Sequence, residues 1–210
     1  EWTTMPNESS RLGSVCVYCG SSNTVDPSYL TDAQSIGESF AKAGLKLVYG
    51  GGGVGLMGAC ARAAHESAGD VLGIMPRFLL TKEMIYEDVE HRIVEDMHTR
   101  KQMMFEESDA FIVLPGGIGT LEEAVEILSW ARLGLHAKPM AFLDEDGFWS
   151  PFFDLMGHII DGKFTPESFR AALVRAVGQA QEAGAVHAEL RGRFLIGRSH
   201  EDHGELDQAA

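Results

Sequence analysis

Short apolar runs alternate with longer amphipathic segments along most of the chain. The apolar runs predict strands at residues 15–18, 45–49, 71–75, 110–114 and 139–143, with a shorter strand at 92–95. The amphipathic segments predict helices at residues 27–43, 56–67, 98–107, 121–133 and 150–160. This alternation predicts an α/β fold, a doubly wound, mainly parallel, Rossmann-like sheet with helices on both faces.

The length of 210 residues fits a single domain, which we place at residues 14–187. We expect the ends, residues 1–13 and 188–210, to be flexible because they are polar and lack the alternating pattern. After Gly162 the pattern weakens. Thr165-Pro166-Glu167 is typical of a helix start, whereas residues 172–177 equally fit a last strand.

Glycine is enriched, with 24 residues, and one cluster, Gly50–Gly58, follows the second predicted strand. It contains G-x-G-x-x-G as Gly53, Gly55 and Gly58, but no acidic residue ends the next strand to bind a dinucleotide's ribose. No Gly-Lys-Ser/Thr follows a glycine cluster, which argues against a nucleoside triphosphate site. Two interpretations stay open here, close helix–strand packing or direct ligand contact.

The second glycine-rich turn, Pro115–Thr120, joins a continuous apolar strand directly to a helix. Its glycines, Gly116, Gly117 and Gly119, let backbone N–H groups converge on an anion, and the helix dipole adds positive potential. The Thr120 hydroxyl is a further donor. The turn therefore predicts a phosphate-binding site at the carboxyl end of the strand.

Two charged positions near this turn each have a structural and a functional interpretation. In Thr120-Leu121-Glu122-Glu123, Glu123 fits a capping box for the Thr120 N–H, or it serves as a carboxylate beside a phosphorylated sugar. Arg100-Lys101 opens the preceding helix, where the dipole does not favour cations, so the pair is either a solvated face or part of a site. Met97, Met103 and Met104 either pack in the core or line an adaptable apolar slot.

Charge and composition limit the function further. The net charge of −14 disfavours binding to nucleic acid or to anionic membranes, but a local site can still bind a small anion. No apolar run reaches the roughly 18–20 residues of a membrane span, and no signal-peptide pattern opens the chain, so we expect a cytoplasmic protein. The three cysteines, Cys16, Cys19 and Cys60, do not form a disulfide framework, and we expect buried structural thiols.

Taken together, these motifs resemble the Lonely Guy family of cytokinin-activating phosphoribohydrolases, long mislabelled as lysine decarboxylases. The resemblance covers about residues 14–165 and is carried by Val15–Ser22, Tyr49–Gly58, Asp96–Lys101, Pro115–Glu123 and Trp130–Gly134. The Pro-Gly-Gly-x-Gly-Thr-x-x-Glu signature combined with the upstream Arg-Lys is the most specific part. Ile118 departs from the family, whose members usually carry an aromatic or small residue there.

The resemblance implies hydrolysis of the N-glycosidic bond of a nucleoside 5′-monophosphate, such as AMP or an N6-prenylated adenine nucleotide, to free base and ribose 5-phosphate. It implies Arg100 and Glu123 as the catalytic pair, with Glu123 acting on the anomeric centre or its water. The residues expected to contact the substrate are Ser21, Gly53, Glu83, Met97, Lys101, Gly116, Gly117, Ile118, Gly119, Thr120, Leu121, Glu122 and Ser129. We expect no metal and no cofactor, and a homodimer or higher homo-oligomer.

The main alternative is a non-catalytic carrier of a nucleotide or phosphate-containing cofactor on the same fold, as in molybdenum-cofactor carriers. A carrier would keep the glycine turn but would not need Arg100 and Glu123 together. An NAD(P) oxidoreductase is disfavoured because no acid follows the third strand. Decarboxylation would need a pyridoxal cofactor on a lysine, and no lysine in the sequence has a suitable setting.

Overall fold

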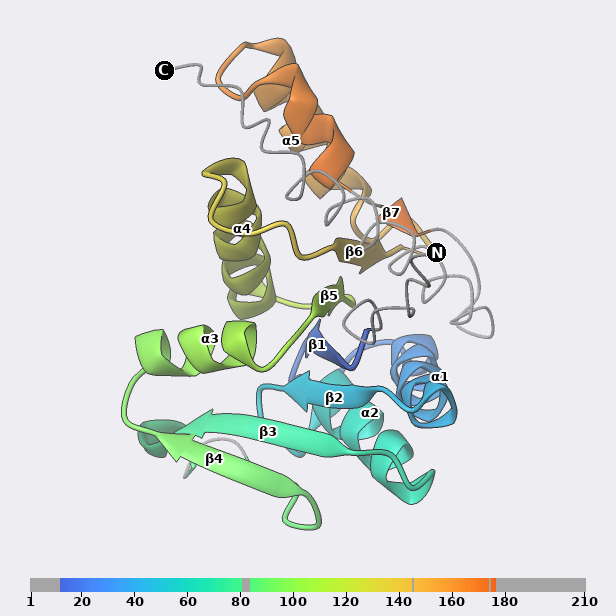
Figure 1. Ribbon diagram of the computed structural model, residues 1–210. Coiled ribbons are helices and arrows are strands. Elements are labelled where there is room, and N and C mark those ends of the chain that lie inside the picture. The colour runs from blue at the N-terminus through green and yellow to red at the C-terminus, as the bar shows by residue number, and fades with distance from the viewer. Residues whose placement is uncertain (1–11, 81–83, 145, 174, 177–210) are drawn as a thin grey trace, which may run out of the picture.

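The computed structural model describes residues 12–80, 84–144, 146–173 and 175–176, which are organised around a seven-stranded parallel sheet (Figure 1). The strands are β1 (Ser14–Tyr18), β2 (Lys46–Tyr49), β3 (Val71–Pro76), β4 (Glu90–Val94), β5 (Ala110–Val113), β6 (Met140–Leu143) and β7 (Arg175–Ala176). The helices are α1 (Pro27–Ala43), α2 (Gly55–Glu66), α3 (Met97–Glu106), α4 (Ile118–Arg132) and α5 (Ser150–Asp161), with short 3₁₀ helices η2 (Arg77–Leu79) and η3 (Glu167–Ala172).

Helices cover both faces of the sheet, as predicted. Alternate residues of β1 show this directly, because Val15 and Val17 pack with α1 and α2, whereas Cys16 and Tyr18 pack with α3, α4 and α5. In Figure 1, α1 and α2 lie on one side of the strands and α3 and α4 on the other. The strands β1, β2, β3, β5 and β6 are mostly apolar because both of their faces are buried, whereas β4 at the edge of the sheet is polar and partly exposed.

The strand order is β4-β3-β2-β1-β5-β6-β7, so the winding direction reverses between β1 and β5. The loops that follow these two strands lie side by side, since the Gly20 amide donates to the Pro115 carbonyl at 3.1 Å. The N-terminal end of α2 joins them, with the Leu56 amide donating to the Gly20 carbonyl at 3.0 Å. In an open α/β sheet, such a switch point is where ligands bind.

The predicted elements are present, with shifted ends. The shifted end that matters most for function is the start of α4. This helix begins at Ile118 rather than Leu121, because Gly117 serves as its N-cap residue. The helix start predicted at Thr165-Pro166-Glu167 forms the 3₁₀ helix η3, and the alternative strand is the two-residue β7. Flexible ends were expected at residues 1–13 and 188–210, of which the structure describes only Leu12 and Gly13. Leu12 is buried and the Gly13 amide donates to the Asp109 Oδ2. The rest of both ends lies outside the described residues.

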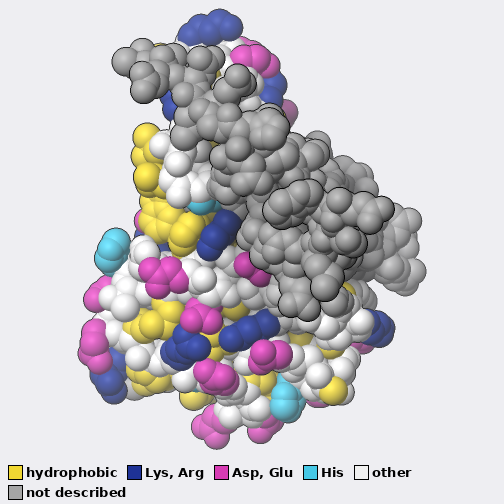
Figure 2. Space-filling model, in the orientation of Figure 1, with side chains coloured by type: hydrophobic (Ala, Val, Ile, Leu, Met, Phe, Trp, Pro, Cys, Tyr) yellow, Lys and Arg dark blue, Asp and Glu magenta, His cyan; other side chains and the backbone are white. Residues whose placement is uncertain are grey.

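The described surface mixes charges of both signs, and hydrophobic side chains gather over α4 in the face shown in Figure 2. Within the described ranges, no helix combines the length and the apolar character needed to cross a membrane.

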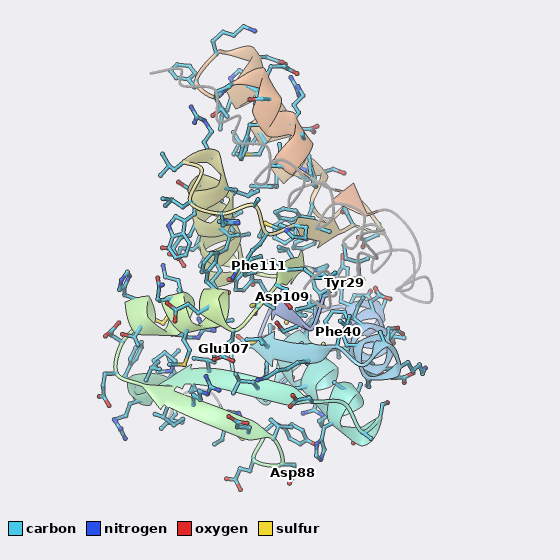
Figure 3. All side chains as sticks on the ribbon, viewed as in Figure 1. Tyr29, Phe40, Asp88, Glu107, Asp109 and Phe111 are labelled. Carbon is cyan, nitrogen blue, oxygen red and sulfur yellow. The ribbon has the colours of Figure 1, made fainter. Side chains whose placement is uncertain are left out.

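Asp109, labelled in Figure 3, ties the starts of the two central strands together. Its Oδ2 accepts hydrogen bonds from the amides of Gly13 at 2.8 Å and Ser14 at 3.0 Å, just before β5 begins at Ala110. Beyond this link, Phe111 of β5 stacks on Tyr18 of β1 with ring centroids 5.8 Å apart. Both contacts fix the register of β5 against β1, and therefore the position of the loops at the other end.

The three cysteines are buried and free, as expected. Burial raises the pKa of the Cys60 thiol to about 12, which keeps it protonated and unreactive. Cys60 lies where α2 crosses α1 most closely. A Cβ built on Gly37 of α1 would stand 2.2 Å from the Cys60 carbonyl oxygen, so glycine is required for this approach.

We therefore expect Gly37→Ala to destabilise the protein by about 1–3 kcal/mol, because α1 and α2 must move apart. Urea unfolding followed by circular dichroism measures this loss. Gly157→Ala on α5 is the matched control, since its Cβ would meet nothing closer than the Arg170 Nη1 at 3.8 Å and helix propensity favours alanine. Equal stability of the two variants would contradict the packing explanation.

Candidate active site at the sheet switch point

A cavity of about 350 Å³ opens at the carboxyl ends of the strands, beside the switch point. Its size is within the range of about 300–1,000 Å³ that is usual for small-molecule sites. The wall is built from the β1 loop, α2, η2, α3 and α4, and the lining residues are Cys19, Gly20, Ser21, Met57, Leu79, Met97, Arg100, Gly117, Ile118, Gly119, Thr120, Glu122 and Glu123. Five segments of the chain thus converge on one space.

The first turn of α4 forms the polar end of this cavity. Gly117 is the N-cap, and it has no side chain to accept a hydrogen bond from the first turn. The amides of Ile118, Gly119 and Thr120 precede the first intrahelical bond, from Leu121 to the Gly117 carbonyl, so they have no partner within the helix. A Cβ at Gly117 or Gly119 would meet nothing within 4 Å, which leaves the approach open. This arrangement suits an anion.

Arg100 and Glu123 form a buried ion pair at the inner end of the cavity. The Arg100 Nη1 lies 2.5 Å from the Glu123 Oε1, and the two side chains are only 9% and 10% exposed. The Arg100 Nε also donates to the Ile74 carbonyl of β3 at 3.1 Å, which fixes the direction of the guanidinium. The pair therefore presents a carboxylate of fixed orientation to the cavity.

Burial raises the pKa of the Glu123 carboxyl above its ordinary value, and the Arg100 charge opposes that rise. The Arg100 charge thus favours the ionised form of Glu123, whereas burial favours the protonated form. A buried carboxyl with a shifted pKa and a fixed charge partner, at the wall of a cavity, is typical of a functional site.

Both structural interpretations of these residues are wrong. Glu123 does not cap Thr120, because α4 starts earlier than predicted and places Glu123 in the second turn, where its carboxylate reaches Arg100 instead. Arg100 is not on a solvated face, since it is buried at 7% exposure. The N-cap of α3 is Asp96, whose side chain accepts a hydrogen bond from the Thr99 amide at 2.8 Å. Asp96 is not among the residues that line the cavity.

Lys101 does not line the cavity but links α3 to α4 beside it. Its ammonium contacts the Glu122 Oε1 at 2.5 Å and the Glu126 Oε1 at 3.0 Å. Burial acts to lower the pKa of Lys101, but the hydrogen bonds to the two glutamates outweigh it and raise the pKa. Lys101 thus stays charged and serves to connect the two helices.

The methionines of α3 divide between the two interpretations. Met104 is fully buried in the core and Met103 packs against it, whereas Met97 lines the cavity. Met57 and Leu79 also line the cavity and, with Met97, give its wall an apolar part. This wall suits a planar or aliphatic group rather than a charged one.

The remaining predicted residues lie at different distances from the cavity. Ser21 lines it, and Gly116 and Leu121 adjoin its lining residues without contributing to the wall. Ser129 is exposed farther along α4. Gly53 is used in packing, since its amide donates to the Met84 carbonyl and its carbonyl accepts from the Arg62 Nη1 at 2.8 Å. Glu83 lies outside the described residues.

Sequence reasoning missed four lining residues, Cys19, Gly20, Met57 and Leu79. Cys19 and Met57 belong to segments that were already associated with the turns, and their apolar side chains gave no signal beyond core packing. Leu79 comes from a stretch without periodicity, and only the fold brings it to the cavity.

Comparison with known proteins gives a consistent result. Residues 57–186 match a family model described as "Possible lysine decarboxylase". The cytokinin riboside 5′-monophosphate phosphoribohydrolase LOG of Oryza sativa subsp. japonica is 42% identical over 168 residues, which is 80% of this chain and 69% of that protein. This chain belongs to the Lonely Guy (LOG) family. LOG7 of Arabidopsis thaliana, with the same enzyme name, is 41% identical over 82% of this chain and 80% of its own length.

Among solved structures, the molybdenum cofactor carrier protein of Chlamydomonas reinhardtii has a TM-score of 0.65 and 20% sequence identity, over 87% of this chain and 99% of that one. At this identity the match shows a shared fold, which the LOG family and the carrier have in common. It agrees with the α/β architecture and does not bear on the activity of the LOG-family chain.

Removal of Arg100 gives a pH-dependent test of the buried pair. In Arg100→Met, the Glu123 pKa rises further above its unfolded value of about 4.3, because the Arg100 charge that opposes the effect of burial is gone. A raised carboxyl pKa gives stability that is fully present below the unfolded pKa and is lost as pH rises through the folded pKa. We therefore expect Arg100→Met to lose about 3–5 kcal/mol at neutral pH and much less at acidic pH.

Urea unfolding at several pH values measures this difference. In the double variant Arg100→Met, Glu123→Gln, the extra pH dependence should disappear because no carboxylate remains to ionise. A single variant whose loss of stability is the same at acidic and neutral pH would refute the buried-pair explanation.

Proposed function

We propose that this protein is a phosphoribohydrolase that cleaves the N-glycosidic bond of adenine-type nucleoside 5′-monophosphates. The observation that carries the proposal is the buried Arg100–Glu123 pair, which lies in the same cavity as the open first turn of α4. The curated relatives at about 40% identity are named cytokinin riboside 5′-monophosphate phosphoribohydrolases, which agrees with this arrangement.

The first turn of α4 would hold the 5′-phosphate through the amides of Ile118, Gly119 and Thr120. Glu123 lies five positions after Ile118, about 7.5 Å along the helix axis, so its carboxylate is displaced from the phosphate towards the ribose. The base would lie against the apolar wall that includes Met57 and Met97. The nucleotide would thus span the cavity from its polar to its apolar end.

In the reaction, the bond between C1′ and the base nitrogen breaks as water adds to C1′, and a proton passes to the departing base. Developing positive charge on the ribose would be stabilised by the Glu123 carboxylate, which would also accept a proton from the attacking water. Arg100 would hold that carboxylate in place and orient the leaving base. The products are the free base and ribose 5-phosphate.

The family description as a lysine decarboxylase does not fit the residues present. A pyridoxal-dependent decarboxylase needs a lysine with a neutral amine for the Schiff base. Among the described residues, no lysine lines the cavity, and the neighbouring Lys101 has a raised pKa because Glu122 and Glu126 hold its charge. Such a lysine is unsuited to nucleophilic attack.

We expect the wild-type protein to release adenine from AMP and isopentenyladenine from isopentenyl-AMP, measured by chromatography. Glu123→Gln should lower kcat/KM by at least about 100-fold, because it removes the proton acceptor and the negative charge at the ribose. Glu126→Gln is the matched control, since it removes a carboxylate on the same helix that contacts Lys101 outside the cavity.

Base release that persists in Glu123→Gln would refute the mechanism. If the wild type released no base from either nucleotide yet bound inorganic phosphate or AMP tightly, the carrier function would be supported instead.

We further propose that the protein forms a homo-oligomer through α4. Large apolar side chains on this helix and just after it are exposed, namely Ile118 at 83%, Val125 at 43% and Leu133 and Leu135 at 67% each. Figure 2 shows hydrophobic side chains gathered over this helix. Exposed apolar groups in such number are typical of an interface, and Ile118 also lines the cavity.

Light scattering coupled to size-exclusion chromatography should therefore show a dimer or larger assembly for the wild type and a monomer for Leu133→Asp. Leu155→Asp on α5, at a leucine that is 52% exposed, is the matched control and should keep the wild-type assembly. A monomeric wild type, or association unchanged in Leu133→Asp, would contradict the assignment of this surface.

A further inference from the structure

Gly50 lies directly behind the ion pair and has no role in the proposal above. It follows the last residue of β2, Tyr49, which pairs with Gly73 of β3, so Gly50 lies level with Ile74. The Ile74 carbonyl is the acceptor for the Arg100 Nε. The guanidinium therefore passes across the ends of β2 and β3 at the position of Gly50.

A side chain at Gly50 would occupy the space of this guanidinium. A Cβ built there would lie 2.2 Å from the Arg100 Nη2, 3.4 Å from its Cζ and 3.1 Å from the Met57 Sδ. The backbone of Gly50 is outside the left-handed region, unlike that of Gly51 with φ of 85°, so alanine could adopt its conformation. The obstacle to a larger residue is therefore the Arg100 side chain, not backbone strain.

Arg100 cannot move aside without losing its partners. Its Nε donates to the Ile74 carbonyl at 3.1 Å and its Nη1 donates to the Glu123 Oε1 at 2.5 Å, in a side chain that is only 9% exposed. A shift of the guanidinium away from Gly50 would lengthen these bonds between two largely buried charged groups. Buried charged groups tolerate such a loss poorly.

We propose that Gly50 is a positioning residue, whose missing side chain reserves the volume for the Arg100 guanidinium and so sets the orientation of Glu123. The effect on catalysis rests on the proposed phosphoribohydrolase activity, whereas the contact itself does not. Within the glycine cluster of residues 50–58, this position serves the reaction by leaving space for a catalytic side chain rather than by contacting the substrate.

A double-mutant cycle between Gly50→Ala and Arg100→Lys tests the contact. Lysine keeps the positive charge but ends near the position of the arginine Cζ, which a Cβ at Gly50 would meet at an ordinary 3.4 Å. Gly50→Ala alone should lower kcat/KM for AMP by about 100-fold, as a displacement near 1 Å at a reacting group does. In the Arg100→Lys background, the same substitution should cost less than about threefold.

The pH profile gives a second readout that a purely structural role would not change. Because Arg100 opposes the rise that burial causes in the pKa of Glu123, displacement of Arg100 should move the acid limb of kcat/KM to higher pH in Gly50→Ala. Gly37→Ala is the matched control, since its Cβ also meets an atom at 2.2 Å, but that atom is the Cys60 carbonyl oxygen. Gly37→Ala should lower stability and leave the acid limb of kcat/KM in place, and its effect should add to that of Arg100→Lys.

Equal losses from Gly50→Ala in both backgrounds, or an unmoved acid limb, would overturn the proposal. If Gly50→Ala fails to fold, recovery of cooperative unfolding in the double variant Gly50→Ala, Arg100→Lys supports the proposal, and failure of both variants to fold overturns it.

If the wild type releases no base, the proposed function fails, and the double-mutant cycle is then measured by the urea midpoints of unfolding. Non-additive midpoints would support the contact between Gly50 and Arg100, and additive ones would refute it.

Discussion

The site depends on one constraint, that an arginine and a glutamate from different helices must be buried together without water. Arg100 comes from α3 and Glu123 from α4, and each is only about one tenth exposed in its side chain. Neither charge is tolerable there alone. The packing of both helices on the sheet, the carbonyl of Ile74 and the absence of a side chain at Gly50 all serve to bring the pair together.

The fold was predictable because its signals are local. Each strand buried on both faces reads as an apolar run, and each helix has its own start and stop residues, such as Pro27 and Gly44 of α1. The start of α4 was placed three residues too late, because Ile118-Gly119-Thr120 looks like a turn in the sequence. Only the sheet context shows that Gly117 can cap the helix by itself and leave its first amides open.

The site was predictable only in part, because its geometry depends on contacts between distant segments. Spacing alone favoured a capping role for Glu123, and the resemblance to a known family was needed to connect it with Arg100. The glycine cluster after β2 was ambiguous for the same reason. Its residues meet different neighbours, Arg100 at Gly50, the Met84 carbonyl at Gly53 and the chain at Ser21 in the case of Gly55. No sequence pattern shows which of these neighbours a given glycine of the cluster will meet.

The ion pairs that Arg100 and Lys101 of α3 form with α4 differ in how strongly dissolved salt screens them. Lys101 and Glu122 lie at the rim, where the Glu122 side chain is 52% exposed, so mobile ions reach and weaken their attraction. The Arg100 and Glu123 side chains are only 9% and 10% exposed, so dissolved ions screen their attraction much less. Rising ionic strength therefore weakens the attraction of Lys101 to Glu122 more than that of Arg100 to Glu123, and the orientation of the Glu123 carboxylate depends little on the salt content of its surroundings.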